Sequence, residues 1–138
     1  MKTESIFVDT NLFLRFLAND VPAQADAVER LLRQAEENKI QLVTNSMVIA
    51  EIIWTLESYY ACERGDIQNK VLAILNTPGL QIPEGNLLLK AVIWYSEKNV
   101  DFIDAYNAVW MEQKGIEKIY TFDQKHFARF DDIEVVKP

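Results

Sequence analysis

Residues that build disulfide frameworks and zinc sites are almost absent from this sequence. Its 138 residues include one cysteine, Cys62, and one histidine, His126. A lone cysteine cannot form a disulfide within the chain, and no spacing of cysteine and histidine matches a zinc site. We therefore expect a protein of a reducing compartment, the cytoplasm. One histidine also disfavours ribonuclease chemistry that needs two groups of suitable pKa, so we interpret His126 as a surface or helix-capping residue.

Glycine is scarce as well, and the spacing of the glycines excludes two common phosphate-binding loops. The sequence has four of them, Gly65, Gly79, Gly85 and Gly115. They form neither the Gly-x-x-x-x-Gly-Lys nor the Gly-x-Gly-x-x-Gly pattern, which argues against P-loop and dinucleotide-binding proteins. A phosphatase that used Asp9 as its covalent nucleophile would require a second acid two residues later, where the sequence has Asn11.

Long apolar runs and an excess of basic residues are also missing. The N-terminal segment offers only Ile6-Phe7-Val8 before an aspartate, which is far too short for a signal peptide core or a membrane span, so we expect no membrane attachment. Lysine and arginine number 14 against 21 aspartates and glutamates, a formal net charge of −7. Because proteins that capture nucleic acids by broad electrostatics carry a basic face, any contact with RNA or DNA is expected to be local or metal-assisted.

The sequence does contain a regular alternation of short β-like runs and longer helical runs. Strands are expected at 5–8, 41–44, 118–121 and 133–136, with a very short one at 80–82. Helices are expected at 11–17, 23–38, 46–59, 65–76 and 102–114, with another from Gly85 through Tyr95. With 49% hydrophobic residues and no repeat or linker, residues 1–138 are expected to form a single domain.

This alternation favours an α/β fold with a mostly parallel central sheet between helices. In such sheets, functional residues gather beyond the carboxyl ends of the strands. Asp9 directly follows the first strand, Glu51 lies in the helix after the second, and Asp123 comes two residues after Thr121. Topology thus predicts that these three carboxylates lie at one edge of the sheet. Asp104, near the start of the 102–114 helix, is placed less firmly by this rule.

Each acid also has an ordinary structural interpretation. Asp9 could cap the helix that follows it, and Asp123 could be a turn residue. Asp101 and Asp104 could be an N-cap and an acid favoured by the helix dipole, although like charges three residues apart repel each other. Glu51 stands among apolar neighbours, so it either faces solvent or is held there for a function, and no lysine or arginine lies one helical turn away to pair with it. That context favours a functional role for Glu51.

Four acids without a convincing nucleophile indicate a divalent cation. Carboxylates brought together repel each other, and two Mg²⁺ ions would neutralise four of them. Hard oxygen ligands favour Mg²⁺ or Mn²⁺ over zinc. Such a cation could activate a water molecule for hydrolysis, and both a one-metal and a two-metal version stay open.

Four short segments, in this order, resemble the PIN-domain family. They are Ile6-Phe7-Val8-Asp9-Thr10-Asn11, Ser46-Met47-Val48-Ile49-Ala50-Glu51, Asp101-Phe102-Ile103-Asp104-Ala105 and Thr121-Phe122-Asp123. The run Leu14-Arg15-Phe16-Leu17, with Asn19-Asp20 and Pro22, is similar to the VapC-like toxins of bacterial and archaeal toxin–antitoxin pairs. Each segment is short, but together they cover essentially the whole chain.

The resemblance implies a three-layer α/β/α fold and a metal-dependent endoribonuclease that serves as a toxin. Asp9, Glu51 and Asp104 match the core acidic positions of the family, and Asp123 matches a fourth, more variable one. We therefore expect these four residues to be both catalytic and metal-binding. Residues expected to support the metal ligands or contact the substrate are Thr10, Asn11, Arg15, Asp101 and Thr121.

The resemblance also implies partners: an RNA substrate, a cognate antitoxin protein and a second copy of the chain in a homodimer. Arg15 is the candidate RNA contact, although a plain solvated arginine fits the sequence equally well. Most of the large aromatic residues on helices are expected in the core, but some, such as Trp54 and Tyr59, could line a dimer or antitoxin interface. The alternative function is a non-catalytic interaction module whose acids bind a basic partner. Metal titration distinguishes the two, since only the nuclease requires a metal site that includes Asp9.

Overall fold

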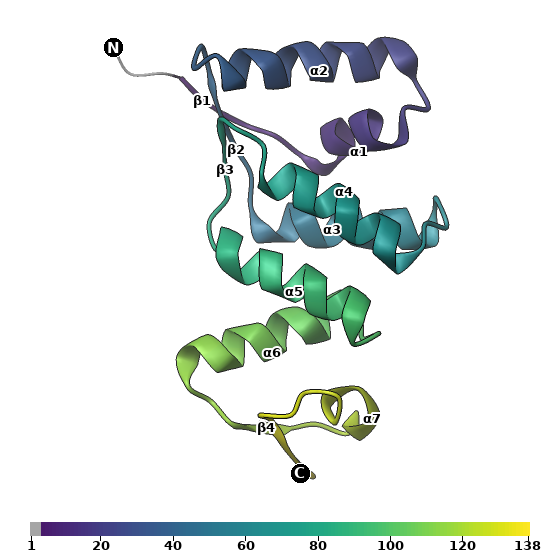
Figure 1. Cartoon of the computed structure of the whole chain (residues 1–138), viewed down its shortest axis with the longest axis vertical. Helices are drawn as coiled ribbons and strands as arrows, with labels where there is room; N and C mark the ends of the chain where they lie inside the picture. Colours follow the sequence, from purple (N-terminus) through teal and green to yellow (C-terminus); the bar gives the residue numbers. More distant parts are fainter. Residues whose placement is uncertain (1–3) are drawn as a thin grey trace. The chain divides into compact units, whose positions relative to one another are not determined.

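The computed structural model describes residues 4–138, which form two compact units (Figure 1). The first unit extends to Gly85, and the second runs from Asn86 to Pro138. Helices dominate both units, and all paired strands among the described residues are parallel. The predicted α/β class with parallel strands is therefore confirmed.

A three-stranded parallel sheet organises the first unit. Its strands are β1 (Ser5–Phe7), β2 (Gln41–Val43) and β3 (Leu80–Gln81), with β2 in the centre. Leu42 is fully buried and lies opposite Ile6 on one side and Leu80 on the other. Just beyond β2, the buried Thr44 hydroxyl donates to the Val8 carbonyl over 2.9 Å. This bond fixes the carboxyl ends of β1 and β2 side by side, at the point where the chain continues to Asp9.

Four helices surround the core of the first unit. They are α1 (Thr10–Ala18), α2 (Pro22–Glu36), α3 (Ser46–Ser58) and α4 (Arg64–Leu75). Helix α1 packs against α2 and α3, and α3 packs against α4 (Figure 1). Asn45 caps α3, because its side chain accepts a hydrogen bond from the Val48 amide over 3.0 Å. The largest fully buried side chains of these helices are Phe13, Ile49, Ile52, Ile53, Leu56, Ile67 and Val71.

The second unit combines helices with a two-stranded parallel sheet. Its elements are α5 (Gly85–Glu97), α6 (Phe102–Lys114), β4 (Lys118–Tyr120), α7 (Gln124–Phe127) and β5 (Glu134–Val136), and β4 pairs with β5. The Arg129 guanidinium donates to the carbonyl oxygens of Lys98, at 3.2 Å, and Asn99. Because Lys98 and Asn99 follow α5, these bonds fasten the segment after α7 to the end of that helix.

Most of the predicted elements are confirmed to within one or two residues. Helix α7 was not predicted, because four residues are too few to show helical periodicity. The strands form two separate sheets, one in each unit. A single domain over residues 1–138, with one continuous sheet between two helical layers, stays a prediction. No helix within residues 4–138 combines the length and apolarity needed to cross a membrane.

Gly79 occupies a position that no other residue fits. Its φ of +80° is in the left-handed region, and a Cβ added there would lie 2.6 Å from the carbonyl carbon of Ala35 and 2.8 Å from its Cβ. Backbone atoms cannot rotate away as a flexible side chain can. The turn before β3 therefore requires glycine for both its conformation and the close approach of α2.

We expect Gly79→Ala to lower the free energy of unfolding by about 1–3 kcal/mol, because it adds both backbone strain and a clash with Ala35. Denaturant titration of the purified variant measures the change. Gly65→Ala in α4 is the matched control: a Cβ there meets nothing within 4 Å, so stability should stay level or rise slightly. Equal stability of the two variants would contradict the steric account of Gly79.

Candidate metal-binding site

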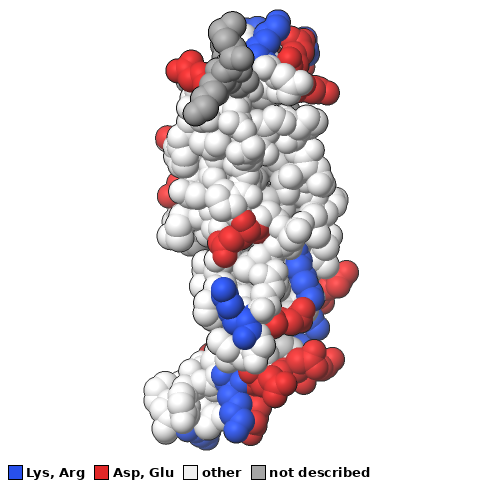
Figure 2. Space-filling view, turned by 90° about the vertical axis from the view of Figure 1, so that its left-hand side faces the viewer, with Lys and Arg blue, Asp and Glu red and all other residues white. Residues whose placement is uncertain are grey.

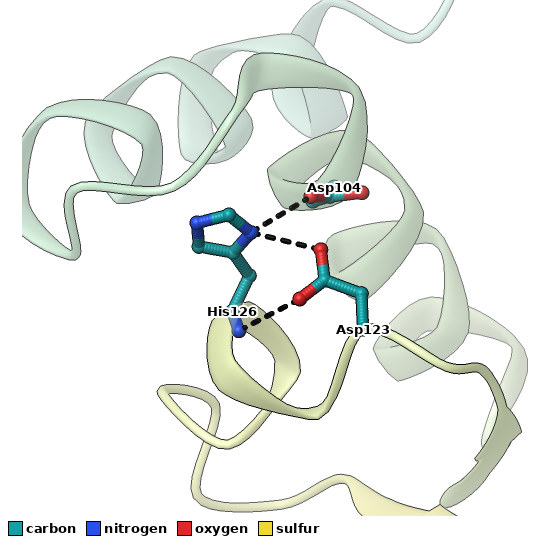
Figure 3. Close-up of side chains that lie close together, drawn as sticks. All are labelled: Asp104, Asp123 and His126. Atoms are coloured by element: carbon teal, nitrogen blue, oxygen red, sulfur yellow. Dashed lines mark hydrogen bonds and ion pairs between the residues drawn. The ribbon is translucent and has the colours of Figure 1, made fainter. Parts of the chain in front are cut away.

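Two aspartates and the single histidine lie together in the second unit (Figure 3). Asp104 lies in the first turn of α6, Asp123 immediately precedes α7, and His126 lies within α7. One side-chain donor atom from each residue lies within 4.8 Å of the other two. All three residues are partly buried, so the cluster lies near the surface and is open to small ions.

Local structure explains the position of Asp123. Its backbone amide donates to the Thr121 hydroxyl oxygen over 3.0 Å, so Thr121 shapes the turn between β4 and α7. One carboxylate oxygen of Asp123 accepts from the His126 amide at 3.2 Å, which makes Asp123 the N-cap of α7. The other oxygen lies 2.8 Å from His126 Nδ1. Both oxygens of Asp123 are thus in contact with the same residue, His126.

The electrostatic environments of the two aspartates differ. Burial raises the pKa of Asp104, and the nearby charges of Asp101 and Asp123 raise it further. The hydrogen bond from the His126 side chain lowers the pKa of Asp123, and the bond from the His126 amide adds to this effect. His126 Nδ1 is farther from Asp104, at 4.0 Å from its carboxylate oxygen. Asp104 is therefore the carboxylate whose charge the protein compensates less well.

Asp101 does not perform the capping role that the sequence left open for it. It occupies the N-cap position of α6, but its side chain makes no capping hydrogen bond. Its negative charge instead adds to the field that raises the pKa of Asp104. Asp101 and Asp104 thus repel each other at the start of α6, as their spacing predicts.

Asp9 and Glu51 belong to the first unit, and both are exposed. Asp9 is at the N-cap position of α1, yet it makes no side-chain capping bond, so the capping interpretation of this residue is wrong. Asp9, Asn11 and Arg15 line an open hollow of about 500 Å³. Arg15 Nη1 lies 3.3 Å from an Asp20 carboxylate oxygen, which also accepts a hydrogen bond from the Tyr60 hydroxyl at 3.0 Å. Arg15 therefore lines the same hollow as Asp9, and its ion pair with Asp20 holds its side chain in place.

Glu51 lies on an exposed and otherwise apolar face of α3. The side chains of Met47 and Trp54, four residues before and three after it, are 76% and 67% exposed. Within residues 4–138 the Glu51 carboxylate has no ion-pair partner. An acid between large exposed apolar side chains is unusual for a purely structural position, since neither burial nor pairing accounts for it.

Some of the predicted site residues lie together in the structure, and others belong to the other unit. Asp104, Asp123 and the adjacent Asp101 lie in the second unit, whereas Asp9 and Glu51 lie in the first. A single site formed by all four acids stays a prediction. His126 is the residue that the sequence interpretation missed as a cluster member. Its position three residues after Asp123 was the available signal, because residues at this spacing share a helical face.

The charged side chains of the described residues are mixed in sign. On the face shown in Figure 2, basic side chains lie interspersed with acidic ones, without a continuous basic area among the coloured residues. Several lysines pair with acids, including Lys70 with Asp66 at 3.0 Å. Such a surface does not attract a polyanion by charge alone.

The sequence profile of the PIN domain matches residues 6–133, so the chain belongs to the PIN domain family. A VapC ribonuclease of Aquifex aeolicus (strain VF5) is 25% identical over 118 residues, which span 86% of this chain and 87% of that protein. A solved structure, that of Mycobacterium tuberculosis VapC20, described as a Sarcin-Ricin loop cleaving toxin, is 22% identical with a TM-score of 0.39. That match covers 96% of this chain and 98% of the other. The resemblance predicted from the sequence is confirmed.

We expect Asp104→Asn to raise the free energy of unfolding of the metal-free protein by roughly 0.5 kcal/mol, because it removes repulsion from Asp101 and Asp123. A carboxyl whose pKa is raised by folding destabilises the native state once it is ionised. The gain should therefore be present at neutral pH and vanish on acidification, when Asp104 is protonated in both states.

Thermal unfolding in EDTA at neutral and acidic pH tests this expectation. Asp26→Asn, at an exposed position of α2, is the matched control and should change stability little at either pH. An Asp104→Asn variant that is less stable than the wild type at neutral pH would mean that the Asp104 carboxylate makes a net favourable contribution to the fold.

Proposed function

We propose that this protein is a metal-dependent endoribonuclease that acts as the toxin of a toxin–antitoxin pair. Membership of the PIN domain family supports the proposal, as does the match to a VapC ribonuclease over most of both chains. The observation that carries it is the Asp104–Asp123 cluster, where two carboxylates lie together with an incompletely compensated negative charge. Asp9 and Glu51 add two exposed carboxylates that the fold itself does not use.

The side chains present are suited to a divalent cation. Asp104 and Asp123 supply hard carboxylate oxygens, and a cation would offset the burial and the repulsion from Asp101 and Asp123 that raise the pKa of Asp104. We propose that Asp104 and Asp123, with Asp9 and Glu51, bind Mg²⁺ or Mn²⁺. When bound, the cation would supply a Lewis acid for hydrolysis of an RNA phosphodiester by water.

The remaining site residues would orient the ligands and the substrate. Thr121 holds the Asp123 backbone, while Asp101 increases the negative charge that attracts a cation to Asp104. Thr10 is buried and Asn11 exposed, so Asn11 is the one that could contact a ligand or a substrate phosphate. Arg15, already paired with Asp20, offers a fixed positive charge beside Asp9 for an RNA phosphate.

We further propose a cytoplasmic location, a homodimer and a cognate antitoxin protein as the setting of this activity. The exposed apolar side chains beside Glu51 on α3 are suitable for burial against a protein partner. A nuclease with an open acidic site would be harmful to the cell unless a partner restrained it. An antitoxin that covers this face of α3 would be placed to reach Glu51.

We expect Asp9→Asn, Glu51→Gln and Asp104→Asn each to abolish Mn²⁺-dependent RNA cleavage, because each removes a carboxylate proposed to bind the cation. Asp123→Asn should have a milder effect. Cleavage of a labelled RNA by each purified variant, with and without EDTA, provides the measurement. Asp26→Asn is the control and should cleave at the wild-type rate.

Two outcomes would contradict this proposal in different ways. Wild-type cleavage that persists in EDTA would exclude a metal-dependent reaction. A folded protein that binds Mn²⁺ but cleaves no RNA, alone or after removal of a co-purifying partner, would favour the non-catalytic interaction module.

Inhibition by the antitoxin should weaken as Mg²⁺ or Mn²⁺ is raised. A basic side chain from the antitoxin, placed near the carboxylates, would compete with the cation for the same negative charge. Titration of purified antitoxin against cleavage at several metal concentrations measures this competition. Inhibition independent of metal would show that the antitoxin blocks the RNA path and leaves the carboxylates alone.

A further inference from the structure

We propose that His126 is a direct metal ligand, so that Asp104, Asp123 and His126 form a three-donor site that prefers transition-metal ions such as Mn²⁺ over Mg²⁺. This inference deepens the proposed function and rests on its metal dependence. It departs from the acid-only site predicted from the sequence, in which His126 was a surface or capping residue.

The positions of the donor atoms support coordination by all three residues. His126 Nδ1 lies 2.8 Å from an Asp123 oxygen and 4.0 Å from an Asp104 oxygen. Two ligands bound at right angles, each with a bond of about 2.1 Å, lie about 3 Å apart, and ligands on opposite sides lie about 4.2 Å apart. The two distances from His126 Nδ1 are close to these values, and all three donor atoms lie within 4.8 Å of one another, so side-chain rotations would bring them to bonding distance of one ion.

The direction of the imidazole ring adds a second argument. Nδ1 is directed at both carboxylates, whereas the other ring nitrogen points away from them (Figure 3). A histidine that only capped α7 would contribute its backbone amide, and the ring would be free to face solvent. Binding of an ion requires the neutral tautomer with its proton on Nε2, in which Nδ1 presents a lone pair to the space between the two aspartates. The hydrogen bond that Nδ1 makes to Asp123 in the metal-free protein would then be replaced by bonds from both residues to the ion.

Asp123 and His126 come from the same short element, because Asp123 is the N-cap of α7 and His126 lies within it. Asp123 caps the helix by accepting from the His126 amide, so the two side chains leave the same turn with a fixed spacing. The Arg129 bonds to the end of α5 fasten the segment that follows. Asp104 comes from a different helix, α6, so an ion bound by all three residues would join α6 to α7.

The ligand chemistry determines the expected selectivity. Mg²⁺ binds oxygen ligands almost exclusively in proteins, whereas imidazole is a good ligand for first-row transition-metal ions. A carboxylate–carboxylate–imidazole set therefore raises the affinity for Mn²⁺ and its neighbours without an equal gain for Mg²⁺. A site made of carboxylates alone would lack this discrimination.

One competing role is that His126 only positions Asp123 by a hydrogen bond. In that role Nδ1 carries a proton that is donated to the carboxylate, and the ring never touches the ion. Glutamine distinguishes the two roles, because its amide N–H can donate to Asp123 but is a poor ligand for a transition-metal ion. His126→Gln would preserve a positioning role and abolish coordination.

The direct test is pulsed electron paramagnetic resonance of the full chain, without a histidine tag, loaded with Mn²⁺. Because His126 is the single histidine of the sequence, any imidazole ¹⁴N coupling to Mn²⁺ must come from this residue. We expect such a coupling, and we expect it to be replaced by the ¹⁵N pattern after growth on ¹⁵N-histidine. This measurement needs no variant and no catalytic activity.

Metal titrations supply the second readout. We expect His126→Gln and His126→Ala to raise the Kd for Mn²⁺ about 10- to 100-fold and to change the Kd for Mg²⁺ far less. Lys125→Ala, at the neighbouring exposed position, is the matched control and should leave both values near the wild type. Circular dichroism of each variant verifies that α7 and the rest of the fold remain.

The outcomes separate this inference from the proposed function. Bound Mn²⁺ without imidazole coupling, or wild-type affinity in His126→Gln, would overturn coordination by His126 and leave the metal-dependent nuclease standing. Failure of the protein to bind Mn²⁺ at all would overturn both.

Discussion

The contact between Asp123 and His126 determines the geometry of the chemically distinctive part of this molecule. Both carboxylate oxygens of Asp123 are engaged, one by the His126 amide and one by Nδ1. The first bond starts α7, and the second aims the imidazole at Asp104. Without this pair, the four residues of α7 would lack the side-chain cap that such a short helix needs. The stability of the turn and the arrangement of the cluster therefore depend on the same few atoms.

The two aspartates of the cluster affect the stability of the fold in opposite directions. The Asp123–His126 contact lowers the pKa of Asp123 and so favours the folded state at neutral pH, with the contribution lost as the pH falls through the pKa of the folded carboxyl. Asp104 acts in the opposite direction, because burial and repulsion raise its pKa and its charge destabilises the fold. A cluster in which one carboxylate is paired and the other is buried and repelled is typical of sites that bind a ligand of opposite charge.

The sequence predicted those features that depend on local pattern. Helical periodicity predicted the long helices, whereas the caps proposed at Asp9 and Asp101 make no side-chain capping bond. Helix α7 was missed because its signal lies in a side-chain bond between residues 123 and 126, which periodicity does not report. The role of His126 was missed for the same reason. Proximity to Asp104, 22 positions earlier in the chain, arises from tertiary packing that no spacing rule describes.

Gly79 illustrates a restriction that reaches beyond its own position. The atoms it approaches belong mainly to the backbone of Ala35, which is itself almost fully buried. Enlarging residue 35 would fill the same space from the other side, and shrinking it to glycine would leave the backbone obstruction in place. Gly79 and Ala35 therefore restrict each other, because they share the same space. No substitution at one of them can compensate for a larger residue at the other.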